Sequence, residues 1–280
     1  MFFGNRLGES GLNVEAACCN HIGKKRNKNE DNYFFQGKIL PLGNDGLSDV
    51  TLRRKAKTKK GLLFAIFDGM GGEADGEIAS YLAAKTCAGS GLFTLAKIGE
   101  QEAETGENLA GNNQAAHIFG QFIDEMNRVV YREARKRFNT MGTTAVMLYI
   151  KEQNMWMCNL GDSKAFFWGE DKLTQISKDH TDAEFLKTHG ITDRKPVLNQ
   201  CLGMDPEEVL LDPFVVERGL QKGDCFLLCS DGLTDMLSRE RISQILGEEK
   251  TAWDCAERLK QESLENGGMD NITVIVVKIR

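Results

Sequence analysis

The sequence predicts an α+β fold in which antiparallel β-sheets are covered by helices on their outer faces. Two observations lead to this prediction: short strand-like segments follow one another through short turns, and helical segments come in groups rather than after every strand. The 280 residues, 41% of them hydrophobic, suffice for a sizeable buried core. Only four prolines and no linker-like tract occur, which favours a single domain over residues 1–280.

The first half of the chain is predicted to contain three strands and two helices. Strand patterns occupy residues 12–19, 31–37 and 61–68. Residues 73–89 have helical spacing, and Gly89 is expected to end that helix. A longer amphipathic helix is expected over residues 114–138. Its apolar stripe consists of Ile118, Phe122, Met126, Val129 and Val130.

Two segments between these elements look irregular. Residues 37–61 are expected to form an insert that ends in the basic run 53–60. The run is interpreted as a solvated loop, with a docking surface for an acidic phosphoprotein as the alternative. Residues 98–113 are acidic and polar and are expected to form a loop.

The second half changes to a two-residue period, which predicts short strands joined by turns. These strands are residues 142–150, 154–160, 163–169, 172–177, 212–220, 224–232 and 271–279. A short helix at 181–190 has a capping box, with Thr181 as N-cap, Glu184 three residues later and Gly190 as the stop. Two further helices are expected over roughly 238–247 and 250–265, the second capped by Thr251 and Asp254.

Composition excludes several classes of function. The net charge of −6 disfavours nucleic acid as a partner, because proteins that bind it usually carry a basic excess. The first ten residues show no signal-peptide pattern, and the longest apolar runs are too short to span a bilayer, so a cytoplasmic protein without membrane contact is expected. The eight cysteines include no CxxC pair and are interpreted as small buried hydrophobes.

A glycine-rich stretch raises the possibility of a dinucleotide site. Residues 69–74 fit the pattern G-x-G-x-x-A, after a strand and before a helix. However, Asp68, Glu73 and Asp75 would place negative charge where a pyrophosphate binds. The acid that should follow about 20 residues later, to hold a ribose, is also missing. These features disfavour a dinucleotide site.

Acidic residues stand at the tips of several apolar strands. Six acids have this position: Glu30, Asp31, Asp68, Asp162, Asp231 and Asp270. Each one taken alone is explained by a turn, since Asp-Gly is a common turn pair at a strand end. Taken together, they predict carboxylates that converge at one end of the sheets.

Crowded carboxylates predict bound divalent metal ions. Such groups repel one another, so their pKa values are raised unless a cation compensates. Oxygen ligands select Mg²⁺, Mn²⁺ or Ca²⁺, and four or more carboxylates suit two ions better than one. A bridged pair of ions is a recurring device of phosphoryl chemistry. Arg26, four residues before Glu30, offers a planar fork for phosphate oxygens.

Seven motifs follow one another along residues 12–280. They are RNKNEDN (26–32), FDGMGG (67–72), GTTAV (142–146), NLGDSKAF (159–166), LTQISKDHT (173–181), CSDGLTDML (229–237) and DNITVIVV (270–277). In this order they closely resemble the motifs of the bacterial metal-dependent protein phosphatases of the type-2C family. Each motif alone is modest, and their combination is specific. The resemblance implies a four-layer αββα sandwich with a dinuclear Mn²⁺ or Mg²⁺ site at one end.

The resemblance also implies a role for each acid. Asp68 would bridge both ions, Asp231 and Asp270 would complete one of them, and Glu30 with the Gly69 carbonyl would complete the other. Asp31 would orient metal-bound water, and Arg26 would bind the phosphate. A third, weaker ion would be held by Asp162, Asp231 and Asp235.

The implied reaction is hydrolysis of phosphoserine or phosphothreonine by a metal-bridging hydroxide, without a covalent intermediate. The implied substrates are phosphoproteins, made by a cognate Ser/Thr kinase, and a monomer is expected. Met70 stands where some family members have a histidine proposed as general acid, which leaves the general acid open. Residues 182–205 correspond to a flap that affects substrate choice, so Arg194 and Lys195 are candidate substrate-binding residues.

Two other functions are weighed against this one. A non-catalytic relative that only binds a partner would have lost metal-binding acids, but this chain keeps every one of them. A metal-dependent phosphohydrolase could act instead on a nucleic acid or a small molecule. The acidic balance disfavours the nucleic acid, and the small molecule remains open.

Overall fold

The computed structural model describes residues 11–43, 49–71, 75–98 and 111–280. Three features noted in the sequence lie outside these ranges: the N-terminal stretch without a signal pattern, residues 72–74 of the glycine-rich pattern, and residues 99–110 of the expected acidic loop. Within the described ranges, no helix combines the length and the apolar character needed to cross a membrane.

Two antiparallel sheets form the centre of the molecule. The first contains, in spatial order, β3 (Asp49–Lys57), β1 (Asn13–His21), β12 (Ile272–Ile279), β11 (Cys225–Cys229), β8 (Lys164–Gly169) and β9 (Lys172–Gln175). The second contains β10 (Phe214–Gly219), β7 (Asn154–Leu160), β6 (Ala145–Lys151), β4 (Leu62–Gly71) and β2 (Asp31–Phe35), and β5 (Met141–Thr143) pairs with the end of β4. Two-residue links join β6 to β7 and β8 to β9, as the sequence predicted.

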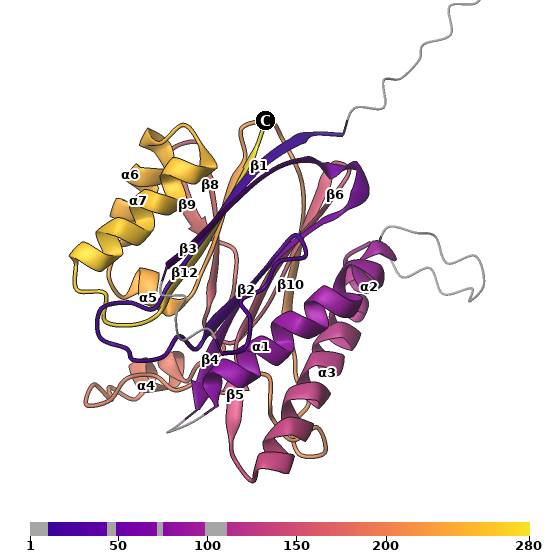
Figure 1. Ribbon diagram of the computed structural model, residues 1–280, viewed down its shortest axis with the longest axis vertical. Coiled ribbons are helices and arrows are strands. Elements are labelled where there is room, and N and C mark those ends of the chain that lie inside the picture. The colour runs from indigo at the N-terminus through magenta and orange to yellow at the C-terminus, as the bar shows by residue number, and fades with distance from the viewer. Residues whose placement is uncertain (1–10, 44–48, 72–74, 99–110) are drawn as a thin grey trace, which may run out of the picture.

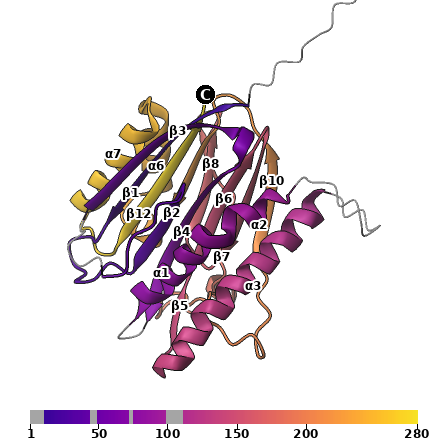
Figure 2. The same cartoon turned by 45° about the vertical axis from the view of Figure 1, so that its right-hand side comes forward.

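Helices cover both outer faces of the sheets (Figure 1; Figure 2). On the second sheet lie α1 (Gly76–Thr86), α2 (Leu92–Ala96) and α3 (Gly111–Arg137), and on the first lie α6 (Arg239–Glu248) and α7 (Ala252–Glu265). Two short helices, α4 (Ala183–Thr188) and α5 (Asp231–Thr234), connect strands. The predicted four-layer αββα sandwich is confirmed.

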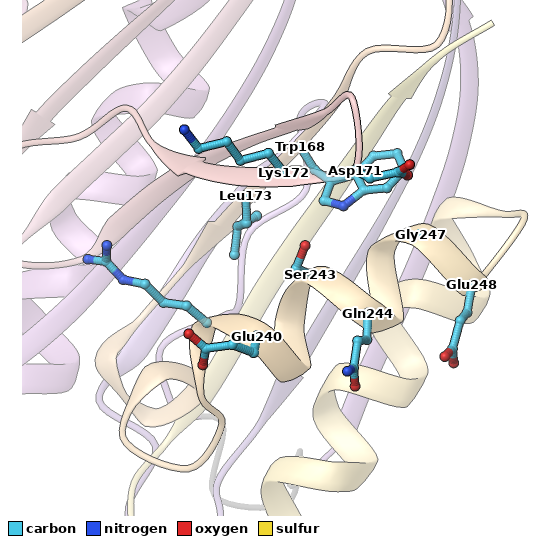
Figure 3. A pocket seen from close by; sticks show the side chains of 10 residues that line it. Trp168, Asp171, Lys172, Leu173, Glu240, Ser243, Gln244, Gly247 and Glu248 are labelled. Atoms are coloured by element: carbon cyan, nitrogen blue, oxygen red, sulfur yellow. The ribbon is translucent and has the colours of Figure 1, made fainter.

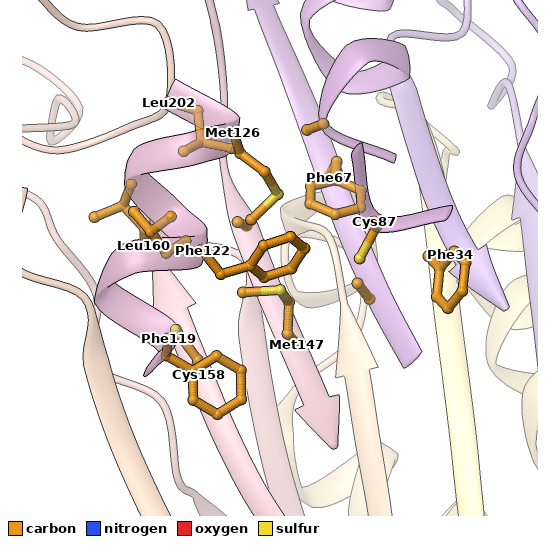
Figure 4. Packing of buried hydrophobic residues seen from close by; sticks show 14 of the residues in the cluster. Phe34, Phe67, Cys87, Phe119, Phe122, Met126, Met147, Cys158, Leu160 and Leu202 are labelled. Atoms are coloured by element: carbon orange, nitrogen blue, oxygen red, sulfur yellow. The ribbon is translucent and has the colours of Figure 1, made fainter. Parts of the chain in front are cut away.

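Each interface between layers has its own buried apolar cluster. Figure 4 shows the cluster beneath α3, in which Phe122 and Met126 face Phe67 of β4 and Met147 of β6. Strand β12 is buried on both faces because it lies between a sheet and a helix layer: Ile275 faces the other sheet, and Val276 faces the α6–α7 side. This double burial explains why β12 reads as a continuous apolar run.

The expectation of an irregular segment over 37–61 is wrong for its second half. Strand β3 pairs with β1 along its whole length, from Asn13 opposite Lys57 to His21 opposite Asp49. Val50 and Leu52 pack against the core between the sheets. Lysines and arginines on the exposed positions hide this two-residue alternation, so most of the basic run 53–60 belongs to an edge strand rather than a loop.

Two helix boundaries also differ from the prediction. Gly89 does not end the first helix: the chain continues through a π-helical turn, Cys87–Gly91, into α2, which buries Leu95. Thr181 is not the N-cap of α4; Asp182 is, and no side-chain cap bond forms there. The Asp182 carboxylate instead accepts hydrogen bonds from Arg194 and, at 2.8 Å, from the Val197 backbone N–H.

Two other predicted helix signals are confirmed. Gly190, which follows the C-cap residue of α4, has φ +65°, and Thr251 caps α7 by accepting a 3.0 Å hydrogen bond from the Asp254 N–H.

Candidate active site

Two of the predicted acids face each other across neighbouring strands. Asp31 begins β2, and its direct partner in the antiparallel register is Asp68 of β4. Directly opposite side chains in such a pair lie about 5 Å apart at Cβ, so the two carboxyls occupy one small volume. The prediction that strand tips bring these acids together therefore agrees with the register of β2 and β4.

Hydroxyl groups from β5 and its end hold Asp68 in place. The Asp68 N–H donates to Thr144 Oγ1 at 3.0 Å, and its carbonyl accepts from the Thr144 N–H and from Thr143 Oγ1, both at 2.9 Å. The chain does not turn after Asp68, although an Asp-Gly pair at a strand end is typical of a turn. It continues as a strand, with Gly69 opposite Thr143 and Met70 opposite Gly142.

The corner beside Glu30 is packed too tightly for side chains on its glycines. A Cβ on Gly69 would lie 2.2 Å from the Gly76 carbonyl and 2.4 Å from the Glu30 carbonyl. A Cβ on Gly76 would lie 2.8 Å from Glu30 Oε1. Glu77 follows in the first turn of α1, and its Oε2 is buried without a hydrogen-bond partner. This corner therefore brings together the Glu30 side chain, the Gly69 backbone and the Glu77 Oε2 atom that lacks a hydrogen-bond partner.

Asp231 and Asp270 come from the other sheet. Asp231 follows β11 and begins α5, so the Asp-Gly pair here starts a helix rather than forming a turn. A Cβ on Gly232 would lie 2.0 Å from the Asn271 carbonyl, which shows how closely the two segments approach. Arg26 donates to Asp270 Oδ2 at 2.6 Å, and half of the Arg26 side chain is exposed.

A buried polar network around Asp31 was not predicted from the sequence. Asp31 Oδ2 accepts hydrogen bonds from Ser230 Oγ at 2.7 Å and from Thr273 Oγ1 at 2.5 Å. Thr273 Oγ1 in turn accepts from Asn20, and Asn20 accepts from Asn29, both of which are buried. The available signal was a polar residue next to a motif acid in an otherwise apolar strand, as in CSD and DNIT.

The electrostatics of the acids agree with the predicted crowding. Burial, opposed by the two hydroxyl hydrogen bonds and reinforced by nearby carboxylates, raises the pKa of Asp31 to about 7. Burial and then the Asp162, Asp270 and Asp235 charges raise the pKa of Asp231 to about 6. The pKa of Asp68 is raised well above its usual range, first by burial and then by Asp31 and Asp231.

The residues expected at a third ion and in the flap are less closely gathered. Asp162 is largely buried, and burial followed by the Asp179 and Asp235 charges raises its pKa against the effect of Lys164. Asp235 is about half exposed, and Lys195 approaches it to 3.7 Å. Arg194 pairs with Asp182 inside the flap segment, so the structure does not bring it to the acid cluster.

The donor set fits divalent metal ions. Its oxygens are carboxylates and a backbone carbonyl, the ligands that Mg²⁺ and Mn²⁺ prefer. Among the described residues, no three His, Cys, Asp or Glu side chains already converge as a complete cage. This finding is compatible with the fit, because Mg²⁺ typically uses one or two carboxylates and keeps several waters.

A separate surface hollow contains none of the predicted site residues. It has a volume of about 620 Å³ and lies between the β8–β9 hairpin and α6, with Trp168 at its upper wall and Ser243 and Gln244 at its lower wall (Figure 3). Its lining mixes charges of both signs, such as Lys172 and Glu240, and lacks the carboxylate cluster.

The cysteines fit their interpretation as small buried hydrophobes, and two of the histidines differ in their surroundings. His180 is buried, and its Nδ1 accepts a 3.1 Å hydrogen bond from the Gly161 N–H. His117 lies exposed on α3. Seven of the eight cysteines are buried, and Cys201 is partly exposed.

The raised carboxyl pKa values predict a pH-dependent stability of the metal-free protein. The folded protein keeps protons on Asp31 and Asp231 at pH values where the unfolded chain has released them, so raising the pH favours unfolding. This stabilisation is complete below about pH 4 and is lost as the pH rises through about 6 to 7. In the presence of chelator, the temperature at the midpoint of unfolding is expected to decrease as the pH is raised from 5 to 7.5. Added Mn²⁺ should restore it.

The matched variant for this measurement is Asp31→Asn, which removes one titrating carboxyl and should flatten the fall. A metal-free midpoint that stays constant or rises over the same pH range would contradict the prediction.

Comparisons with known proteins were made by sequence and by structure. Residues 49–266 match the family model described as Protein phosphatase 2C. The serine/threonine phosphatase stp of Listeria innocua is 32% identical over 223 residues, which cover 76% of this chain and 82% of the relative. The serine/threonine protein phosphatase PstP of Mycobacterium tuberculosis is 30% identical over 226 residues, 78% of this chain and 40% of that longer protein.

Solved structures give the same result at the level of the fold. The phosphatase Stp1 of Staphylococcus aureus superposes with a TM-score of 0.72 at 26% identity, covering 99% of this chain and 100% of that chain. The catalytic domain of PstP, solved in complex with two manganese ions, superposes with a TM-score of 0.68 at 26% identity, covering 96% of this chain and 99% of that one.

Proposed function

The chain belongs to the protein phosphatase 2C family of metal-dependent serine/threonine phosphatases, and from this premise we propose that it dephosphorylates phosphoserine and phosphothreonine in proteins at the acid cluster around Asp68. One observation supports this location above the others. Asp31, Asp68 and Asp231 come from both sheets, interact with one another and have raised pKa values. Such a set needs cationic charge, which two divalent ions would supply, and the same ions would neutralise a bound phosphate group.

Each acid has a proposed role in holding the two ions. Asp68 would contact both, Asp231 and Asp270 would serve one, and Glu30 with the Gly69 carbonyl would serve the other. When bound, the ions would supply an activated water and neutralise the charge of the attacked phosphate. Their identity as Mn²⁺ or Mg²⁺, and a third ion at Asp162, Asp231 and Asp235, are parts of this proposal.

Two residues of the site would act on water and on the phosphate. Asp31 accepts hydrogen bonds from two hydroxyls on Oδ2 and lies opposite Asp68, so it would orient a water at the ions. Arg26 is half exposed and can turn its guanidinium from Asp270 toward phosphate oxygens. Met70 carries no titratable group, so the leaving group must take its proton from elsewhere than this position.

We further propose that the protein is a cytoplasmic monomer with one catalytic domain over residues 1–280, acting on the phosphoproteins of a cognate Ser/Thr kinase. Lys195, close to Asp235, is the flap residue best placed to approach a substrate. Arg194 is kept as a candidate only if its pairing with Asp182 opens. A small-molecule phosphoester is the competing substrate class.

The proposal is tested by hydrolysis of a phosphothreonine peptide with Mn²⁺, with chelator, and in Arg26→Ala. Chelator is expected to abolish turnover, and Mn²⁺ to restore it. Arg26→Ala should raise KM by about tenfold, because one charge-assisted contact to phosphate contributes about 1.4 kcal/mol or more. Lys25→Ala, on the exposed neighbour, is the control and should keep the wild-type KM.

Two results would contradict the proposal. Undiminished turnover in chelator would exclude the two-ion site. A large fall in kcat at unchanged KM in Arg26→Ala would exclude phosphate binding as the role of Arg26.

A further inference from the structure

A second cavity lies directly beside the acid cluster. It has a volume of about 680 Å³ and is formed by the end of β4, β5, the C-terminal part of α3 and the segment 201–208. Met70, one of its lining residues, stands two positions after Asp68 in β4. Alternate residues of a strand point to the same face, so the Met70 side chain and the Asp68 carboxylate share a face about 7 Å apart along the strand.

The outer wall of this cavity is fixed by the backbone of segment 201–208. Leu202 exchanges two backbone hydrogen bonds with Thr143 of β5, at 3.1 and 2.9 Å. The buried Asn127 of α3 donates to the Met204 carbonyl at 3.0 Å and accepts from the Gly203 N–H at 2.7 Å. Gly203 has φ +101°, and a Cβ there would lie 2.3 Å from the Met141 carbonyl. The outer wall of the cavity is therefore fixed by hydrogen bonds to β5 and α3 and is not a loose loop.

The lining presents sulfur and methyl groups. Met70, Met141, Met204 and Cys201 all line the cavity, and the missing side chain of Gly142 leaves room between Met70 and Cys201. Two of the polar lining residues are engaged, since the Tyr131 hydroxyl donates to Asp205 and Asn139 donates to Asp75. The other charged or hydroxyl-bearing lining residues, Arg135, Thr140 and Glu208, are exposed. Methionine side chains are flexible and polarizable, so they adapt to apolar groups of different shape.

We propose that this cavity, the methionine pocket, receives an apolar side chain of the phosphoprotein substrate, one or two positions from the phosphorylated residue. The inference rests on the proposed phosphatase function and adds a sequence preference to it. An extended peptide advances about 3.3 Å per residue, so a phosphate at Asp68 puts a neighbouring side chain at the pocket. Arg135 lines the same cavity and is exposed, so an acidic side chain is the alternative that the test must separate.

The test uses phosphothreonine peptides that carry Leu, Ser or Asp at each of the two positions on either side of the phosphothreonine. Para-nitrophenyl phosphate, which has no neighbouring residue, reports the chemistry alone. At one of these positions, the peptide with Leu is expected to have a kcat/KM about tenfold higher than the peptide with Asp, as is typical of an apolar subsite.

Variants of Met204 assign the preference to the pocket. Met204→Glu is expected to lower the ratio of the Leu-peptide kcat/KM to that of para-nitrophenyl phosphate by about tenfold. Met204→Ala keeps the pocket apolar and should keep the preference for Leu over Asp. Leu210→Glu, two positions beyond segment 201–208, is the matched control, because Leu210 is 91% exposed and outside the pocket. Thermal unfolding verifies that each variant is folded.

The outcomes separate the two proposals. Equal rates for all peptides, a preference for Asp, or an equal effect of Met204→Glu and Leu210→Glu would overturn the methionine pocket and leave the phosphatase function standing. Hydrolysis of neither the peptides nor para-nitrophenyl phosphate in Mn²⁺ would overturn the proposed function itself.

Discussion

Replacement of Asp68 by asparagine is expected to lower kcat for a phosphothreonine peptide by about a thousandfold or more, the scale seen when a major electrostatic group of an active site is lost. Asp68 lies opposite Asp31, interacts with Asp231 and is held at its backbone by Thr143 and Thr144. The amide keeps the shape of the side chain but not its charge, so it cannot serve two cations. The measurement is steady-state hydrolysis over a titration of Mn²⁺.

Asp171→Asn is the control for this variant. It makes the same chemical change on an exposed turn between β8 and β9, away from the six acids, and should leave kcat within about twofold, as surface substitutions usually do. Asp68→Asn should also lose part of the Mn²⁺-dependent rise in unfolding temperature. Retention of more than a tenth of wild-type kcat at saturating Mn²⁺ would remove Asp68 from the centre of the mechanism.

Gly69→Ala is expected to destabilise the protein by about 2–3 kcal/mol and to abolish most activity, because it forces a carbon into a filled corner. The new Cβ would lie 2.2 Å from the Gly76 carbonyl and 2.4 Å from the Glu30 carbonyl, both backbone atoms that cannot rotate away. Relief requires moving the start of α1 or the segment that carries Glu30. Either movement displaces proposed metal-binding oxygens. Urea unfolding and peptide hydrolysis measure the two effects.

Gly120→Ala makes the same substitution where nothing lies within 4 Å of the new carbon. Gly120 is inside α3, so alanine there should raise stability by up to about 1 kcal/mol and leave activity unchanged. If Gly69→Ala folded with wild-type stability and activity, the tight contact at this corner would be disproved.

Most of the fold could be predicted from hydrophobic period and turn residues. The long helix α3 shows its period plainly, because one of its faces is buried and the other is exposed. Strands β6 and β7 read as apolar runs, because both of their faces are buried. Strand β3 was missed because it lies at a sheet edge, where charged residues occupy exposed positions and local pattern is weak. The pairing of β3 with β1 depends on contacts far apart in sequence, which a local pattern does not contain.

The acids of the candidate site could be predicted, but their supports could not. Asp68 and Asp231 stand out as charges at the ends of apolar runs. Asn20, Ser230 and Thr273 look like ordinary polar residues until the two sheets are brought together. Their role depends on a hydrogen-bond network that crosses from one sheet to the other, and single-sequence spacing carries no record of that crossing.

Strand β3 has a consequence for the behaviour of the molecule at high concentration. An unpaired strand edge is a template on which another copy could extend the sheet, a first step toward aggregation. Here that edge carries Arg54, Lys55 and Lys57 at exposed positions. Two copies that approached edge to edge would bring like charges together, so the basic side chains of this edge guard against self-association through β3.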